Sequence, residues 1–242
     1  MRILIFFLDA IFTSDIIANE ELLIDQFFGK SGIKDKKSVY SGEMITHLNR
    51  PTLGESLPTG VNRQYRLIEK TKHSAIYAVL LSKDDKTQDW YIYLVNENNS
   101  WKISAIRNLA LPGLFFIVLQ ELSNKEKRTK EEEIQYQNMS LTIKSDLFLK
   151  NYLKDNITVF NQIAKLSKSN LTAANKLAKT IHLNYVELNK VTSVIDINIG
   201  GMIDNSVGYM FIPVGAKLPK ISTDHYIYIE KVKDQWYLYK TT

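Results

Sequence analysis

The sequence predicts an α+β fold of two tandem modules, each with helices first and an antiparallel meander sheet after them. One observation is a repeat at a constant offset of 135 residues: His47-Leu48-Asn49 recurs as His182-Leu183-Asn184, and Asp89-Trp90-Tyr91-Ile92-Tyr93 recurs as Asp224-His225-Tyr226-Ile227-Tyr228. The other is that apolar residues of helical spacing precede β-branched and aromatic runs in both halves. Matching segments at one offset indicate two copies of a single structural unit.

The expected helices open each module. Ser14-Asp15 can cap a helix that runs to about Phe28, where Gly29 ends it. Ser145-Asp146 has the same role in the second module, and 170–183 predicts a further amphipathic helix. The apolar positions that mark the helix after Ser145 are Leu147, Leu149, Leu153 and Ile157.

The expected strands follow the helices and are separated by polar turns. They cover 65–68, 75–81, 90–95 and 101–106 in the first module, and 193–199, 207–214, 226–229 and 236–239 in the second. Trp101 and Trp236 also keep the offset of the repeat, and each begins a final strand. We expect both indoles to be buried at equivalent places in the two cores.

The repeat divides the chain into a first module at residues 1–109, a connector at 110–139 and a second module at 140–242. The connector contains the mixed-charge run from Asn124 to Glu133, which is typical of a solvated helix or linker. Its apolar stretch, between Leu114 and Leu119, is suited to packing on the modules. We therefore expect a helical, charged connector.

Composition excludes several kinds of site. The chain has no cysteine, which removes disulfides, thiolate nucleophiles and cysteine-ligated zinc. Its net charge of +5 is spread along the sequence, and abundant lysine, isoleucine and asparagine point to an A·T-rich bacterial genome, so the charge is weak evidence for nucleic acid. The histidines and acidic residues show no metal-ligand spacing. We expect neither a metal nor another cofactor.

The first residues are compatible with two cellular locations of the protein. Met1 to Phe12 has the charge-then-apolar order of an export signal, but Asp9 interrupts the apolar stretch and no small-x-small cleavage site follows closely. We therefore expect a native first helix in a cytoplasmic protein, with an exported or periplasmic protein as the alternative if residues 1–13 act as a signal peptide. The apolar run from Leu109 to Leu119 is too short to span a bilayer, so we expect no transmembrane segment.

One face of each sheet is expected to be rich in tyrosine. With turns at Asn96–Asn99 and Lys231–Asp234, side-chain alternation places the following tyrosines opposite the helices: Tyr91, Tyr93, Tyr226, Tyr228, Tyr237 and Tyr239. The leading interpretation is that these faces pack on each other, which makes the chain an intramolecular pseudo-dimer. The alternatives are a surface for an external protein, and base stacking on nucleic acid beside Lys231, Lys233 and Lys240.

The order of elements resembles a known superfamily. Helices leading into a meander that ends in Tyr91-Ile92-Tyr93, a polar turn and Trp101-Lys102-Ile103 resemble the nuclear transport factor two-like, cystatin-like superfamily of cone-shaped α+β domains. The second copy, with Tyr226-Ile227-Tyr228 and Trp236-Tyr237-Leu238, is similar but lacks the lysine. The resemblance implies a strongly bent sheet, a pocket at the open end of the cone and frequent pairing through the sheets. It implies no particular activity, because members include isomerases, dehydratases, carriers and inert binding modules.

Few residues are candidates for chemistry. His47 and His182 are candidate general bases, since imidazole titrates near neutrality and both occupy one repeated position. A role at a helix end or turn explains the same motif and is the preferred interpretation. The leading function is therefore non-catalytic binding of a protein or a small apolar ligand. The alternatives are a small-molecule isomerase, dehydratase or hydrolase that uses a cone histidine with a tyrosine, and nucleic-acid binding on the tyrosine and lysine face.

Overall fold

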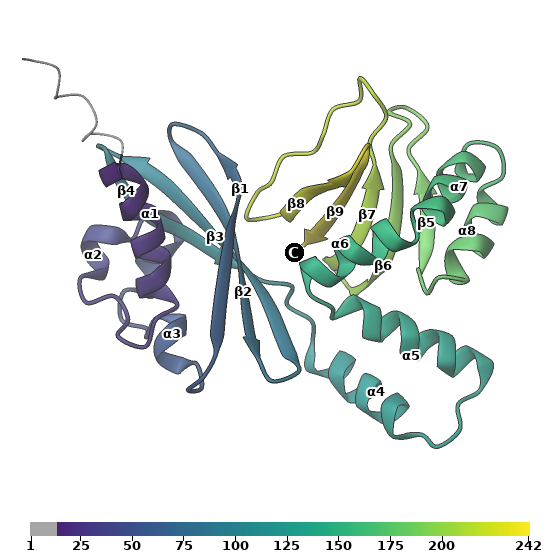
Figure 1. Cartoon of the computed structure of the whole chain (residues 1–242), viewed down its shortest axis with the longest axis horizontal. Helices are drawn as coiled ribbons and strands as arrows, with labels where there is room; N and C mark the ends of the chain where they lie inside the picture. Colours follow the sequence, from purple (N-terminus) through teal and green to yellow (C-terminus); the bar gives the residue numbers. More distant parts are fainter. Residues whose placement is uncertain (1–13) are drawn as a thin grey trace, which may run out of the picture. The chain divides into compact units, whose positions relative to one another are not determined.

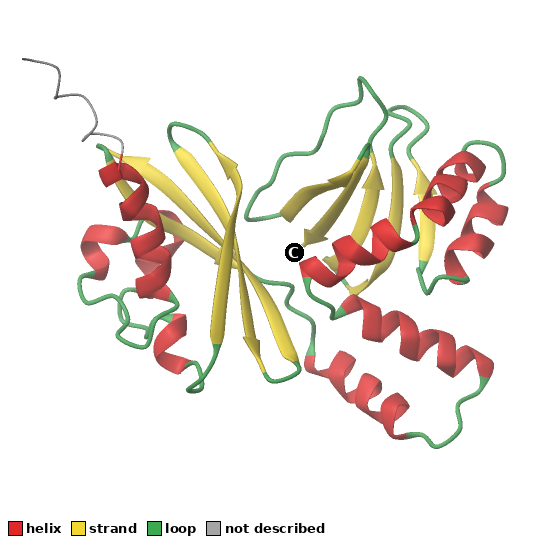
Figure 2. Cartoon of the chain, viewed as in Figure 1, coloured by secondary structure: helices red, strands yellow, loops and turns green. Residues whose placement is uncertain are grey.

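The computed structural model describes residues 14–242, which form two compact units. The first contains the chain up to Val79 together with Ile92–Ile106, and the second contains Leu80–Tyr91 together with Arg107–Thr242. Helices and antiparallel sheets make up the fold (Figures 1 and 2), which confirms the predicted α+β class. The expected helix or signal at Met1 to Phe12 lies outside the described residues, and the module boundaries at 109 and 140 stay a prediction.

The first unit contains a four-stranded meander with helices on one face (Figure 1). The helices are α1 (Ser14–Phe27), α2 (Lys36–Val39), the 3-10 helix η1 (Gly42–His47) and α3 (Leu53–Ser56). The strands are β1 (Asn62–Lys70), β2 (Ser74–Lys83), β3 (Lys86–Glu97) and β4 (Ser100–Arg107), of which the segment Leu80–Tyr91 belongs to the second unit. Helix α1 ends at Phe27, as the predicted stop at Gly29 requires. Its residues Leu23, Ile24 and Phe27 are buried and contribute to the core of this unit.

The second unit contains five helices, α4 (Gly113–Asn124), α5 (Lys130–Thr142), α6 (Asp146–Asp155), α7 (Ile157–Ser167) and α8 (Leu171–Lys179). Two helices are present where a single helix was expected after Ser145. The helical structure is interrupted at Asn156, between α6 and α7. Leu149 is fully buried, whereas Leu147 is 53% exposed. Residues two apart on a helix point in nearly opposite directions, so one apolar face cannot hold both. No described helix is both long and apolar enough to cross a membrane.

The sheet of the second unit departs from a meander. Its strands are β5 (Tyr185–Leu188), β6 (Ile195–Met202), β7 (Asn205–Phe211), β8 (Tyr226–Lys233) and β9 (Trp236–Thr241), in the spatial order β5-β6-β7-β9-β8. Strand β9 pairs with β7, and β8 lies at the edge, which the long connection 212–225 allows. The short strand β5 was not predicted, since half of its residues are exposed and polar or aromatic.

A bulge in β8 separates two tyrosines that the sequence placed on one face. Tyr226 pairs with Thr241 and Tyr228 pairs with Lys240, so one extra residue of β8 is inserted between these pairs. Neighbouring residues of β9 point to opposite faces, and Tyr226 and Tyr228 therefore do too. Tyr226 packs edge-on against Tyr239, whereas Tyr228 lies on the face of Lys240. The expectation that Tyr226 and Tyr228 share a face is wrong.

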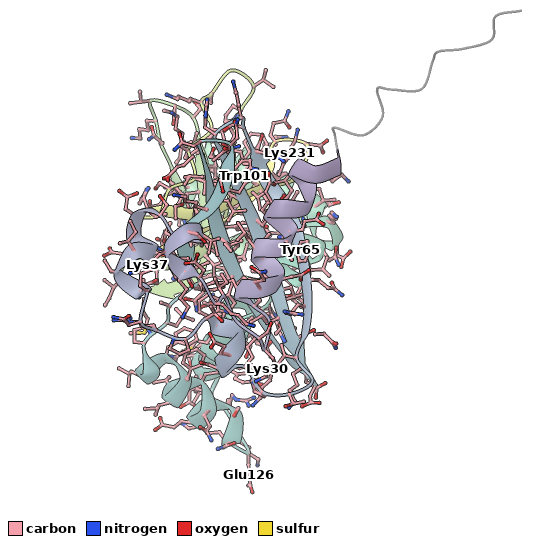
Figure 3. All side chains as sticks on the ribbon, turned by 90° about the vertical axis from the view of Figure 1, so that its left-hand side faces the viewer. Lys30, Lys37, Tyr65, Trp101, Glu126 and Lys231 are labelled. Carbon is pink, nitrogen blue, oxygen red and sulfur yellow. The ribbon has the colours of Figure 1, made fainter. Side chains whose placement is uncertain are left out.

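The two predicted tryptophan anchors are both buried, which confirms that part of the core assignment. Trp101 is 3% exposed in the first unit and Trp236 is 1% exposed in the second. The Trp236 indole N–H donates to Oδ1 of Asn161 over 3.0 Å, and Phe160 packs edge-on against the ring. Figure 3 shows Trp101 on the sheet of the first unit.

Candidate functional site

A cavity of about 290 Å³ lies in the second unit between α4, α5 and β6. Its apolar walls are Leu114, Phe115, Val118, Met139 and Met202, and its polar groups are the side-chain amides of Gln135, Asn138 and Asn184. Gly200 and Gly201 line it with backbone only. None of these described lining residues carries a titratable side chain, so the site suits binding of a neutral molecule better than acid–base chemistry.

The α4–α5 hairpin that forms one wall is held at its turn by Arg128. The guanidinium donates to the carbonyl oxygens of Leu122 and Ser123 and to the carboxylate of Glu133, and it lies 3.9 Å from the ring centre of Tyr136. These bonds satisfy carbonyls at the end of α4 that helical bonding leaves free. Figure 3 shows Glu126 pointing away from the protein at this turn. The charged connector predicted from the sequence is thus an ordered pair of helices.

The opposite side of the cavity depends on close packing of α5 against β6. The Asn138 amide donates to the carbonyl oxygens of Ile199 and, over 2.9 Å, of His182. A Cβ atom at Gly200 would lie only 2.2 Å from Oγ1 of Thr142, so a larger residue there would displace the Thr142 side chain. Strand β5 pairs with β6 no further than Asn198, and the segment of β6 beyond it therefore borders the cavity.

A second cluster in the same unit is polar and completely enclosed. The Lys240 ammonium lies 2.8 Å from Oδ1 of Asp146 and 3.1 Å from Oδ2 of Asp89. The Tyr91 hydroxyl donates to Oδ1 and Oδ2 of Asp146, over 2.9 and 3.1 Å, and the Asp146 backbone N–H donates to Oδ2 of Asp89 over 2.8 Å. All four side chains are buried. Two carboxylates thus share one lysine in a site closed to substrates.

Burial and the neighbouring charges act in opposite directions on the pKa values of Asp89 and Lys240. Burial raises the pKa of Asp89 to about 6, with the Lys240 charge opposing the rise and Asp146 adding to it. For Lys240, burial acts to lower the pKa, but the carboxylates of Asp146 and Asp89 outweigh it and the pKa is raised. Burial also raises the pKa of the Tyr91 phenol far above its usual value, so this hydroxyl keeps its proton.

The two candidate general bases lie apart, one in each unit. His47 ends η1, half-buried, and its carbonyl oxygen accepts from the backbone N–H of Arg50. His182 follows α8 with a positive φ of 57°, and its Nδ1 is buried without a hydrogen-bond partner among the described residues. His182 therefore has the turn position that the sequence favoured. Neither histidine lines the cavity.

The tyrosines proposed as a ligand or partner face occupy several different environments. Tyr91 and Tyr228 stack on each other in the second unit and are fully buried, and Tyr93 is buried in the first. Tyr239 belongs to a cluster with Met210, Ile212 and Ile229, against which the half-buried Tyr226 and Tyr237 pack. Ile221 of the connection 212–225 packs against the same cluster.

Neither the cavity nor the polar cluster was predicted from the sequence. For the cluster, one signal was present: Lys240 follows Trp236 and Leu238 at a spacing of two and so lies on their apolar face. Its grouping with Lys231 and Lys233 as a surface cation is wrong, because Lys240 is buried. Asp89 and Asp146 are far from Lys240 in sequence, and no local pattern links them.

Comparisons of the chain with protein-family models, with curated proteins and with solved structures found no match. The resemblance to the nuclear transport factor two-like superfamily therefore stays a prediction.

Proposed function

We propose that this chain is a non-catalytic binding protein whose ligand is a small apolar molecule held between α4, α5 and β6. The observation that carries the proposal is the lining of the cavity, with apolar walls, three amide side chains and no titratable group among its described residues. Sites of this composition hold a ligand by its apolar surface and orient it with a few polar groups.

The volume of the cavity and the uncharged side chains of its described lining limit the class of ligand. A volume of about 290 Å³ is at the low end of ligand pockets, which favours a compact molecule. The oxygen of Asn138 offers an acceptor, because both of its amide hydrogens bind backbone carbonyls, and the amides of Gln135 and Asn184 offer donors and acceptors. These groups suit a hydroxyl, carbonyl or amide group of the ligand. A charged ligand would lose its hydration without gaining a counter-ion from the lining. We therefore infer an uncharged ligand with an apolar body.

Exposed apolar side chains lie at the cavity and beside it. Leu114, which lines the cavity, is 59% exposed, and Ile117 on the same helix is 55% exposed without lining it. Exposed apolar groups gathered on one element favour a binding surface. Phe116 and Ile117 also favour a second candidate, in which this face of α4 binds a protein.

The test is binding of a neutral apolar dye, Nile red, by the purified chain, together with native mass spectrometry for a ligand carried through purification. Leu114→Asp should lower dye affinity at least about tenfold, because a charge is placed against an apolar ligand. Ile117→Asp is the matched control, with the same helix, similar exposure and no contact with the cavity, and should bind the dye like the wild type. Equal binding by both variants, or no binding by the wild type, would contradict the small-ligand proposal.

The other candidate functions have less support. An enzyme would need a titratable group at the cavity, and His47 and His182 lie elsewhere. Base stacking needs exposed tyrosines beside free lysines, whereas Tyr228 and Lys240 are buried. If Ile117→Asp abolished capture of a protein without changing dye binding, the protein-binding function would be favoured for α4.

A further inference from the structure

We propose that Lys240 and Asp146 join in an intramolecular isopeptide bond, with Asp89 as the proton shuttle. The proposal is independent of the cavity and of any ligand. It rests on the enclosed cluster of the second unit, in which an amine, a carboxyl group, a proton acceptor and a hydroxyl donor meet.

The reacting groups are already in contact. Nζ of Lys240 lies 2.8 Å from Oδ1 of Asp146, so the nitrogen is beside the carbon that it would attack. Holding two reactants at this separation replaces a bimolecular encounter with an intramolecular step, which is a very large advantage in effective concentration. The reaction needs to occur only once in each molecule, so a step far slower than an enzymatic turnover is sufficient.

Each neighbour of the reacting groups has a chemical role. Oδ2 of Asp89 accepts a hydrogen bond from Nζ of Lys240 over 3.1 Å, which places a base on the proton that must leave. The Tyr91 hydroxyl donates to both oxygens of Asp146 and stabilises the negative charge that develops there when nitrogen attacks. Tyr228 stacks on Tyr91, and burial excludes the water that would otherwise drive the reverse hydrolysis.

The step balances without an oxidant or a cofactor. Asp89 takes one proton from the Lys240 ammonium, and the nitrogen lone pair attacks Cγ of Asp146. The nitrogen then loses a second proton. One carboxyl oxygen of Asp146 receives both protons, by way of Asp89, and leaves as water, so an ammonium and a carboxylate become an amide and one water. Asp89 ends the reaction in its starting state.

The first test is the intact mass of the full chain under denaturing conditions. The wild type should be lighter than its sequence by one water, and proteolysis should give a branched peptide that joins residues 146 and 240. A wild type at full mass after incubation for several days at pH 5 to 8 would overturn the proposal. A branched peptide that joins Lys240 to residue 89 would overturn the assignment of Asp146.

Variants test the roles of the individual groups. Lys240→Arg and Asp146→Ala should show the full mass, because each lacks one reacting group. Asp89→Asn keeps the size of the side chain but removes the base, and it should react at least tenfold more slowly than the wild type. Lys231→Arg, at an exposed lysine of β8, is the matched control and should still lack one water. Circular dichroism confirms that each variant is folded, and an Asp89→Asn variant that reacts at the wild-type rate would overturn the role of Asp89.

Discussion

The ring of Tyr91 stacks on the ring of Tyr228, with 4.8 Å between the ring centres and 19° between the planes. Both side chains are fully buried. Such pairs contribute about 0.5–1.5 kcal/mol beyond the burial of their surfaces. A double-mutant cycle with Tyr91→Leu and Tyr228→Leu should give a coupling energy of this size in urea denaturation. The pair Tyr226→Leu and Tyr228→Leu is the control, since these rings lie on opposite faces, and its effects should add; equal coupling in both cycles would argue against the stack as the cause.

A buried glutamate of α1 contacts both β1 and β2 in the first unit. The Tyr77 hydroxyl donates to Oε2 of Glu20 over 2.6 Å, and the Lys70 ammonium lies 2.7 Å from Oε1. Glu20→Ala removes the acceptor of the Tyr77 hydroxyl and the ion-pair partner of Lys70, and we expect it to lower the free energy of unfolding by about 2–4 kcal/mol. Glu20→Gln keeps an oxygen acceptor and should cost less. Fluorescence of the tryptophans during denaturation provides the measurement, and equal loss in both variants would show that the hydrogen bond from Tyr77 is unimportant for stability.

Stability should depend on pH through Asp196. Burial raises its pKa to about 6, although the Tyr239 hydroxyl donates to Oδ1 over 2.7 Å and favours the ionised form, while Glu187 adds to the rise. The native carboxyl keeps its proton where an unfolded aspartate, with a pKa of 3.8, has lost it. Its contribution to stability is therefore complete below about pH 4 and is lost as pH rises through about 6.

The variant Asp196→Asn isolates this effect. We expect the wild type to lose about 1–3 kcal/mol of unfolding free energy between pH 4 and 6 through this carboxyl alone. The amide of the Asp196→Asn variant cannot ionise. The difference in unfolding free energy between the variant and the wild type should therefore increase, in favour of the variant, from pH 4 to 6. Asp89, whose pKa burial also raises to about 6, remains in both proteins and cancels in the comparison. Parallel pH profiles for the two proteins would contradict the prediction.

The Trp236 indole should be one of the largest single contributors to the stability of the second unit. It is 1% exposed, packs edge-on against Phe160 and Phe211, and donates to Asn161. Trp236→Ala should cost about 3–5 kcal/mol, because a large cavity and an unpaired amide remain. Trp90→Ala is the comparison, since Trp90 is only half-buried, and it should cost less. Thermal and urea denaturation measure the loss of stability in both variants. A larger loss for Trp90→Ala than for Trp236→Ala would contradict the assignment of Trp236 to the core.

Local signals in the sequence predicted much of this fold. Ser145 caps α6 as expected, through its side-chain oxygen and the backbone N–H of Phe148, because capping depends only on residues within one turn. Trp101 and Trp236 are buried because large apolar side chains that alternate along a strand define a core face. These inferences need no knowledge of distant contacts.

Features that depend on distant contacts could not be predicted in this way. The bulge that turns Tyr228 away from Tyr226 is a property of the β8–β9 pairing, and an alternation rule applied to one strand misses it. The meeting of Asp89, Asp146 and Lys240 requires three segments to come together, which no spacing within the sequence encodes. The cavity likewise depends on how α4 and α5 pack against β6.

The position of β8 at the edge of its sheet has a consequence for self-association. The edge of a sheet is the place where another extended chain can add as a further strand, which is a route to aggregation. Here Lys231 and Lys233 are exposed on β8, and Glu230 on the same strand pairs with Lys150. A strand from a second molecule would have to strip water from these charges before it could pair. The arrangement therefore protects the protein from growth of the sheet into fibrils along this edge.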